Sequence, residues 1–196
     1  LGDTGLENEW KILVHNLSER GILGYYIVNE GFGASPGLAN ANDDVLPSAF
    51  MPPLYAYFIY IIKLTFSNFV DYVSIIIIIQ ILLSVITAFL FFKILKISET
   101  SMLSFYSALI FSLIPINIYA SVQISSISIQ VFLLVYLFYI IKIFAENKQI
   151  SYKNLFIFSI LSGLLILLRG EFILFYLLTI TYFFLFYTKD IKIFLI

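Results

Sequence analysis

The apolar residues of this chain gather into long, nearly continuous runs, and most of the polar residues precede them. Residues 1–55 carry Gly, Asn, Asp, Glu and Ser in quantity, and from there to the last residue the chain is almost entirely apolar. Runs of this length are typical of membrane helices, which need about 20 apolar residues. Five spans are predicted: residues 72–95, 102–119, 127–144, 155–168 and 172–187.

A short amphipathic helix is predicted at residues 7–20. Trp10, Leu13, Val14 and Leu17 recur at the spacing i, i+3, i+4, i+7, which places them on one face of a helix. Gly21 follows and can end the helix. Such a helix favours the membrane surface. Between this helix and residue 52 the sequence has no periodic pattern, so we expect a long loop.

A second short apolar segment covers residues 52–68. Pro53 suits the first turn of a helix, and the segment is too short for a comfortable crossing of about 30 Å of hydrocarbon. Tyr57, Tyr60, Lys63 and Ser67 fall in one stripe along it, which suits an interfacial helix better than a lipid-exposed span. We therefore expect a juxtamembrane or re-entrant helix, with a short tilted span as the alternative.

Composition supports an integral membrane protein of the all-α class. Of 196 residues, 61% are hydrophobic and 12% are charged, whereas soluble domains are about one quarter charged. The net charge of −1 gives no basic field for nucleic acid. The absence of cysteine excludes disulfides and thiol chemistry, and the single histidine, His15, is too little for a histidine metal site.

The lysines of the connecting loops predict the orientation. Cytoplasmic loops are enriched in Lys and Arg. Lysines follow the first and fifth predicted spans and lie between the third and fourth, whereas the other two loops have none. With the lysine-rich loops inside, residues 1–71 form an extracytoplasmic loop with juxtamembrane helices, and residues 72–196 form a multi-span helical bundle. We also expect the chain to be part of a longer protein, with further membrane helices before Leu1 and after Ile196.

Candidate chemistry lies mainly in the polar opening. Asp3, Glu7 and Glu9 are candidate general bases, because a carboxylate at a low-dielectric boundary can activate a hydroxyl. An N-terminal charge on the helix at 7–20 is the alternative role for Asp3. Asp43 and Asp44 are interpreted as a solvated turn rather than a metal pair, so a divalent metal is possible but not indicated.

Two further places offer substrate contacts. Pro53 and Tyr55 belong to the stretch Met-Pro-Pro-Leu-Tyr, whose prolines fix an extended entry into the helix that follows. Arg169 lies at a membrane boundary, where a guanidinium can bind phosphate oxygens with two parallel hydrogen bonds. A local ion pair between Arg169 and Glu171, or snorkelling, explains the same residue equally well.

The order of these parts resembles a known family. The pattern EW-x-x-L-x-x-N-L, the stretch PSAFMPPLY, the loop SLIPINIYASVQISS and the segment GLLILLRGEF are similar to parts of the polytopic membrane glycosyltransferases of the protein O-mannosyltransferase and aminoarabinose-transferase kind. The family's Asp-Glu pair is not present as such. Alignment through Trp10 places Leu6 and Glu7 there, so Asp3, Glu7 and Glu9 all remain candidates. Gly170 stands where the family has proline.

The resemblance implies an enzyme of the cell envelope. Such proteins transfer a sugar, with inversion, from a polyprenyl-phosphate donor to a lipid, glycan or protein acceptor outside the bacterial inner membrane. The donor is a co-substrate, and no cofactor is certain. A transporter or a flippase for lipid-linked sugars is the alternative, and it predicts polar or broken helices at mid-membrane. A non-catalytic assembly subunit is a third reading. The polar residues gather outside the spans, which favours the transferase.

Overall fold

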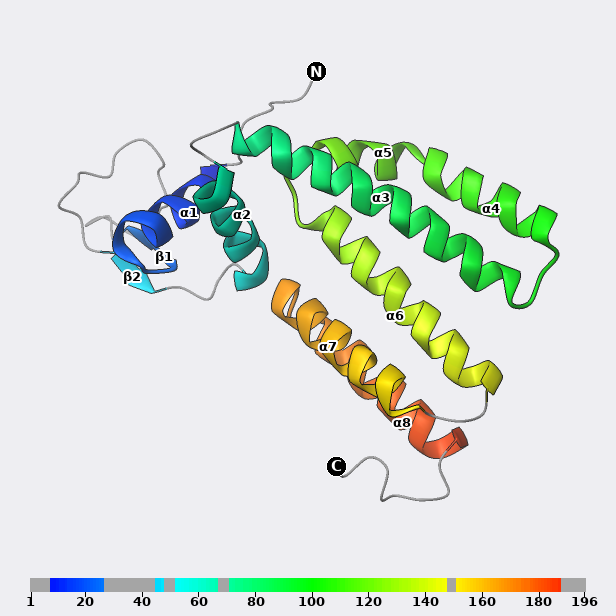
Figure 1. Ribbon diagram of the computed structural model, residues 1–196. Coiled ribbons are helices and arrows are strands. Elements are labelled where there is room, and N and C mark those ends of the chain that lie inside the picture. Colours follow the sequence, from blue (N-terminus) through cyan, green and yellow to red (C-terminus); the bar gives the residue numbers. More distant parts are fainter. Residues whose placement is uncertain (1–7, 27–44, 48–51, 67–70, 148–150, 188–196) are drawn as a thin grey trace.

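The computed structural model describes residues 8–26, 45–47, 52–66, 71–147 and 151–187, and it is mostly helical (Figure 1). In chain order the elements are α1 (Asn8–Arg20), β1 (Gly24–Tyr26), β2 (Val45–Pro47), α2 (Pro53–Phe66), α3 (Tyr72–Lys96), α4 (Ser101–Leu113), α5 (Pro115–Val122), α6 (Ile127–Asn147), α7 (Tyr152–Leu168) and α8 (Phe172–Tyr187).

The predicted amphipathic helix at 7–20 is confirmed as α1. Trp10, Leu13, Val14 and Leu17 are all buried, so the face read from their spacing is the face that packs. Gly21 follows the helix with a φ of 68°, a left-handed conformation that glycine adopts without strain.

The expectation of a loop without regular structure at 21–51 is wrong for its two ends. The strands β1 and β2 pair antiparallel, with Tyr25 opposite Leu46. The side-chain amide of Asn16 is fully buried and donates a 2.8 Å hydrogen bond to the carbonyl of Gly24, which ties β1 to α1. Strands of three residues are too short to show an alternating pattern.

Helix α2 begins at Pro53, as its sequence predicts, and contacts α1, α3 and α7. Its 14 residues are about 21 Å long at 1.5 Å per residue, which is less than the hydrocarbon thickness. In Figure 1 it stands at an angle to the long helices, beside the start of α3. The helix is thus shorter than a perpendicular crossing needs, and its juxtamembrane or re-entrant position stays a prediction.

The five predicted spans fall on the six helices α3 to α8, of which two are uninterrupted and long enough to cross a membrane. Helices α3 and α6 are long and apolar enough to cross a membrane. Helices α7 and α8, with 17 and 16 residues, are shorter than the usual span of about 20. A bundle of about five full spans is therefore only partly confirmed.

The predicted span at 102–119 is wrong as a continuous helix. It is divided into α4 and α5, which are bent by 55° relative to each other. Pro115 starts α5 and disfavours a helical conformation at the preceding residue, and Ile114 has φ −59° and ψ 123°. Counted as one broken span, this pair raises the number of candidate spans to three.

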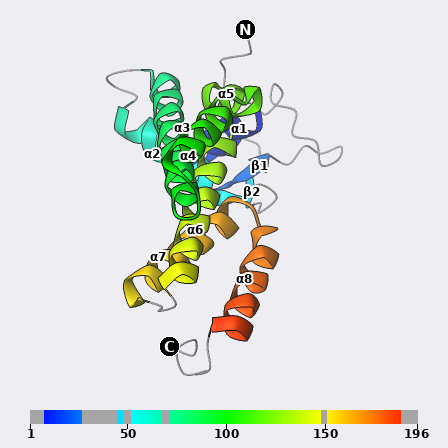
Figure 2. The ribbon, with the colours of Figure 1, turned by 90° about the vertical axis from the view of Figure 1, so that its right-hand side faces the viewer.

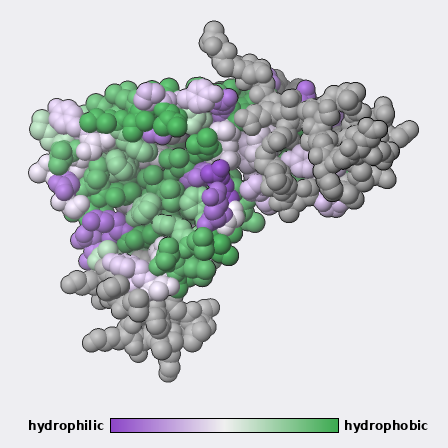
Figure 3. All heavy atoms as spheres, turned by 180° about the vertical axis from the view of Figure 1, so that it is seen from behind, coloured by the Kyte–Doolittle hydropathy of each residue, from purple (hydrophilic) through white to green (hydrophobic). Residues whose placement is uncertain are grey.

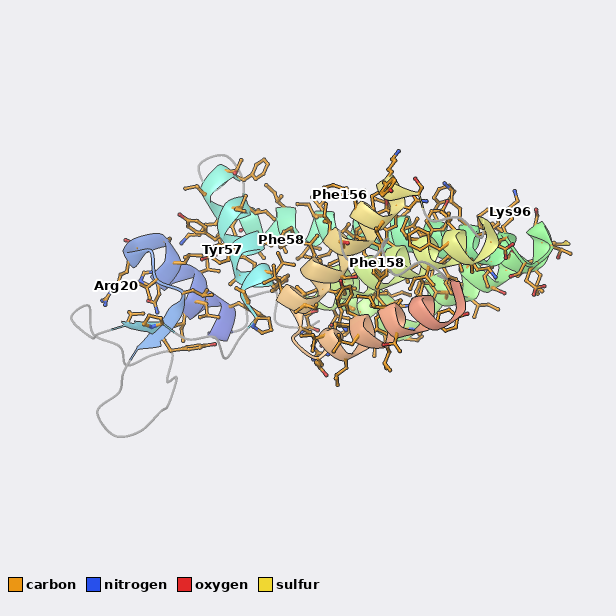
Figure 4. All side chains as sticks on the ribbon, turned by 90° about the horizontal axis from the view of Figure 1, so that it is seen from below. Arg20, Tyr57, Phe58, Lys96, Phe156 and Phe158 are labelled. Carbon is orange, nitrogen blue, oxygen red and sulfur yellow. The ribbon has the colours of Figure 1, made fainter. Side chains whose placement is uncertain are left out.

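The lysines next to the connections of the long helices lie at the end of the bundle away from α1 and α2, which themselves carry Lys11 and Lys63. Figure 1 shows α3 and α6 running away from α2, with α4 and α7 returning. Lys93 and Lys96 end α3, Lys142 lies near the end of α6, and Lys153 starts α7. In Figure 4, Lys96 lies at the far end of the molecule from Arg20 of α1. The lysines of these connections therefore gather at one end of the bundle, and the orientation of that end in a membrane stays a prediction.

One apolar cluster joins the short helices to the bundle. It includes Trp10 of α1, Tyr55 of α2, Ile76 of α3, Leu137 of α6 and Leu165 of α7. The two predicted parts, residues 1–71 and 72–196, therefore share one hydrophobic core. Figure 2 shows α7 and α8 extending beyond the other helices at one end of the molecule. Figure 3 shows a broad hydrophobic face over the long helices, which suits contact with lipid chains.

Candidate functional site

The three candidate carboxylates lie at or before the start of α1. Asp3 and Glu7 are outside the described residues. Glu9 is in the first turn of α1, immediately before Trp10. The Trp10 ring packs edge-on against the Tyr55 ring, with their centroids 4.9 Å apart. The first turn of α1 is thus held next to the first turn of α2.

Tyr55, a predicted substrate contact, has no exposed surface. Its ring also stacks with Phe58 at 5.9 Å, and its hydroxyl accepts a 3.2 Å hydrogen bond from the side-chain amide of Gln80. In this conformation Tyr55 packs α2 against α1 and α3. A substrate contact by Tyr55 stays a prediction, and it would require neighbouring side chains to move.

Pro53 and Arg169, the other predicted substrate contacts, belong to neighbouring parts of the fold. The start of α2 lies beside the end of α7 in Figures 1 and 4, and the two helices are in contact. Pro53 is the first residue of α2, and Arg169 directly follows α7. These residues, more than a hundred positions apart in sequence, therefore lie in the same region of the molecule.

Arg169 forms the local ion pair that the sequence offered as one of its roles. Its Nε lies 3.5 Å from an Oε of Glu171, and the two side chains are 52% and 73% exposed. Exposed pairs of this kind contribute little stability, at most about 1 kcal/mol. A guanidinium carries five N–H donors, so the pair with Glu171 leaves donors for a phosphate.

A polar stripe on α3 was missed by sequence reasoning. Gln80, Ser84 and Thr87 recur at i, i+4 and i+7 in a helix otherwise rich in Ile and Leu. Gln80 is fully buried, and its amide nitrogen also donates to the carbonyl of Ser125 at 2.7 Å. Its Oε1 is buried and has no hydrogen-bond partner among the described residues. The spacing of polar residues within an apolar run is the signal that finds this stripe.

The stripe faces the break between α4 and α5. A cavity of ≈ 20 Å³ lies there, between the middle of α3 and the start of α6. It is large enough for one water molecule, which needs about 10–15 Å³. Its polar lining comes from Ser84, Thr87, Asn117 and Ser128. Asn117 belongs to α5, and Ser128 lies in the first turn of α6.

Asp71, which precedes α3, is an acid with a structural role. Its carboxylate accepts hydrogen bonds from the Ser74 hydroxyl at 2.9 Å and from the backbone N–H groups of Val73 and Ser74. The Ser74 hydroxyl, followed by these N–H groups, holds the pKa of Asp71 below its usual value. These bonds cap the helix and occupy the carboxylate oxygens.

No group of three or more His, Cys, Asp or Glu residues that could hold a metal ion occurs within the residues that the structure describes. The hydrogen-bonding groups around α2 include the amide of Gln80, the hydroxyl of Tyr55, the ammonium of Lys63, which donates to the Ser18 hydroxyl at 3.2 Å, and the exposed Arg169.

These features define a class: a mostly helical protein in which two helices, or three with the broken pair, are able to cross a membrane. Membrane association follows from these helices. Comparison of the chain with models of protein families, with curated proteins and with solved structures gives no match.

Proposed function

We propose that this chain is part of a membrane glycosyltransferase that takes a sugar from a polyprenyl-phosphate donor and passes it to a lipid, glycan or protein hydroxyl or phosphate. The transfer takes place on the extracytoplasmic side of a bacterial inner membrane and inverts the sugar carbon. This proposal rests on the resemblance of the four sequence segments together with the placement of the residues that they contain.

The observation that carries the proposal is the convergence of the start of α1, the start of α2 and the end of α7 at the bundle end away from Lys93, Lys96, Lys142 and Lys153. Glu9 is on the first of these, Pro53 on the second, and Arg169 follows the third. Such a transfer needs a carboxylate base and a phosphate-binding guanidinium. It also needs a backbone whose position is fixed, as proline fixes the start of α2. In the orientation predicted from the sequence, with the lysine-rich connecting loops inside, this convergence belongs to the outer side.

Each group has a defined role in the proposed reaction. One carboxylate of the opening accepts the proton of the acceptor, and the acceptor oxygen attacks the sugar carbon from the face opposite the phosphate. The bond from that carbon to the phosphate oxygen breaks, and polyprenyl phosphate leaves with the electron pair. Arg169 stabilises the negative charge of the leaving phosphate.

The role of Arg169 gives the first test. In the full-length protein in lipid, Arg169→Gln is expected to raise the KM for the polyprenyl-phosphate donor about 10- to 100-fold, because a charge-assisted hydrogen bond contributes about 1.5–3 kcal/mol. Arg169→Lys should recover part of the loss, since lysine keeps the charge but not the planar fork. Donor consumption at several donor concentrations measures the KM.

Glu171→Gln is the matched control. It removes the partner at 3.5 Å but keeps the guanidinium, so the donor KM should stay the same or fall. If Arg169→Gln leaves the donor KM unchanged, Arg169 does not bind the donor phosphate, and its role is the local pair alone.

One observation favours the second candidate function, a transporter or lipid-linked-sugar flippase. The sequence-based objection to it, that the polar residues gather outside the spans, is wrong for Ser84 and Thr87, which line the cavity at the α4–α5 break near the middle of α3. Broken helices and polar side chains at mid-membrane are typical of transport sites. The two candidates differ in outcome: a transporter moves the donor intact, whereas a transferase cleaves it.

A further inference from the structure

An open groove between α3 and α4 lies near the lysine-bearing end of the bundle. Its volume is ≈ 330 Å³, and its lining is almost entirely apolar. The lining residues are Ala88, Phe89, Phe92, Phe105, Ala108, Leu109 and Ser112.

Two alanines explain why the groove is hollow. Ala88 of α3 and Ala108 of α4 line it with a single methyl group each, while Phe89 and Phe105 stand beside them. Both phenylalanines are more than half exposed, at 55% and 56%, so no described part of the chain covers this groove. Small residues between larger ones leave room for a slender apolar chain.

Two cations stand at one end of the groove. The ammonium of Lys93 lies 4.6 Å from the centre of the Phe89 ring, and that of Lys96 lies 5.7 Å from the centre of the Phe92 ring. Both rings line the groove, so the charges are held over its wall.

These two charges are not neutralised by an ion pair within the described part of the chain. Lys142, near the same end of the bundle, differs because it pairs with Glu146 at 3.6 Å. Glu99 is exposed three residues after Lys96 and forms no ion pair with it. Lys93 and Lys96 therefore present positive charge to whatever occupies the groove.

The length of the groove along α3 is similar to the hydrocarbon thickness of one bilayer leaflet. Half of a 30 Å hydrocarbon core is about 15 Å, which corresponds to about ten residues of helix. From Ala88 to Lys96, the groove and its cations fall within that length. An apolar chain in the groove thus places its head group at the lysines.

We propose that this groove binds an anionic phospholipid, with one acyl chain between α3 and α4 and the phosphate at Lys93 and Lys96. Charge complementarity selects an anionic over a zwitterionic lipid, because juxtamembrane lysines attract anionic head groups. This inference is independent of the proposed sugar transfer, since the groove lies at the opposite end of the bundle.

Photocrosslinking tests the proposal. The protein is placed in phosphatidylcholine nanodiscs containing a small fraction of phosphatidylglycerol with a diazirine in its acyl chain, and crosslinked peptides are mapped by mass spectrometry. We expect crosslinks to the groove residues of α3 and α4, and these should exceed those from a phosphatidylcholine diazirine probe. The double variant Lys93→Gln, Lys96→Gln should lose this preference, which we expect to be about 25-fold at about fivefold per lysine.

Lys153→Gln is the matched control, because Lys153 is exposed at the same end of the bundle but does not belong to the groove. It should keep the preference for phosphatidylglycerol. Ala108→Leu fills the groove and should reduce crosslinking by both probes. Equal crosslinking by the two probes in the unchanged protein would overturn the proposal. An absence of groove crosslinks from both would mean that another protein segment or a second copy covers the groove, and would overturn it as well.

Discussion

Replacing Tyr55 with alanine is expected to destabilise the protein by about 3–5 kcal/mol, the range for removing a large aromatic side chain from a core. The ring has no exposed surface and contacts both Trp10 and Phe58. Its loss opens a cavity where α1, α2 and α3 meet, and it removes a hydrogen-bond partner from the buried Gln80. Thermal unfolding in nanodiscs measures the effect as a lower Tm.

The variant Tyr55→Phe distinguishes a packing role of the Tyr55 ring from a substrate contact by its hydroxyl. This variant keeps the ring and loses only the hydroxyl, so it should cost about 1 kcal/mol. If Tyr55 has only a packing role, turnover by Tyr55→Phe stays near that of the unchanged protein. A large loss of turnover without a loss of stability would instead show that the hydroxyl touches substrate. A loss of less than about 1 kcal/mol in Tyr55→Ala would contradict the packing role.

One carboxylate of the opening is expected to be indispensable for turnover. Among Asp3→Asn, Glu7→Gln and Glu9→Gln, a single variant should lower kcat for donor consumption by about 10² or more, because a general base contributes that much. Each substitution removes the proton acceptor with little change in shape. The measurement is the initial rate of donor loss in the full-length protein in lipid, compared with its Tm.

Asp43→Asn and Asp44→Asn are the controls for this series. Both acids are interpreted as a solvated turn, so their removal changes net charge without touching the proposed chemistry. We expect turnover close to that of the unchanged protein. If all three candidate variants behave like these controls, no carboxylate of the opening acts as the base.

Periodicity predicted the helices well where their buried faces are regular. The spacing of Trp10, Leu13 and Leu17 predicted both α1 and the side on which it is buried. Pro53 marked the start of α2 because proline lacks the N–H that a helix interior needs. The five apolar runs likewise located the later helices, because continuous hydrophobicity is a strong signal.

The features that were predicted wrongly or missed depend on tertiary contacts or on the local geometry of one residue. Pro115 is the local signal for the break between α4 and α5, but the prediction of a span at 102–119 rested on the apolar run alone. The pairing of β1 with β2 joins residues about twenty positions apart, which no local pattern reveals. Gln80 was overlooked because one polar residue scarcely changes the hydropathy of a span of 25 residues. For the candidate site, residue types could be proposed from the sequence, but the placement of Pro53 and Arg169 in one region depends on the packing of α2 against α7.

The most direct test of the proposed transfer follows the donor itself. The full-length protein, purified in lipid, is given a panel of polyprenyl-phosphate sugars with candidate acceptors, and the release of free polyprenyl phosphate is measured. The proposal predicts release from at least one donor, dependent on acceptor, with the sugar recovered on the acceptor in inverted configuration. Donors that are bound or moved across the membrane but never cleaved would contradict it and would favour the transporter.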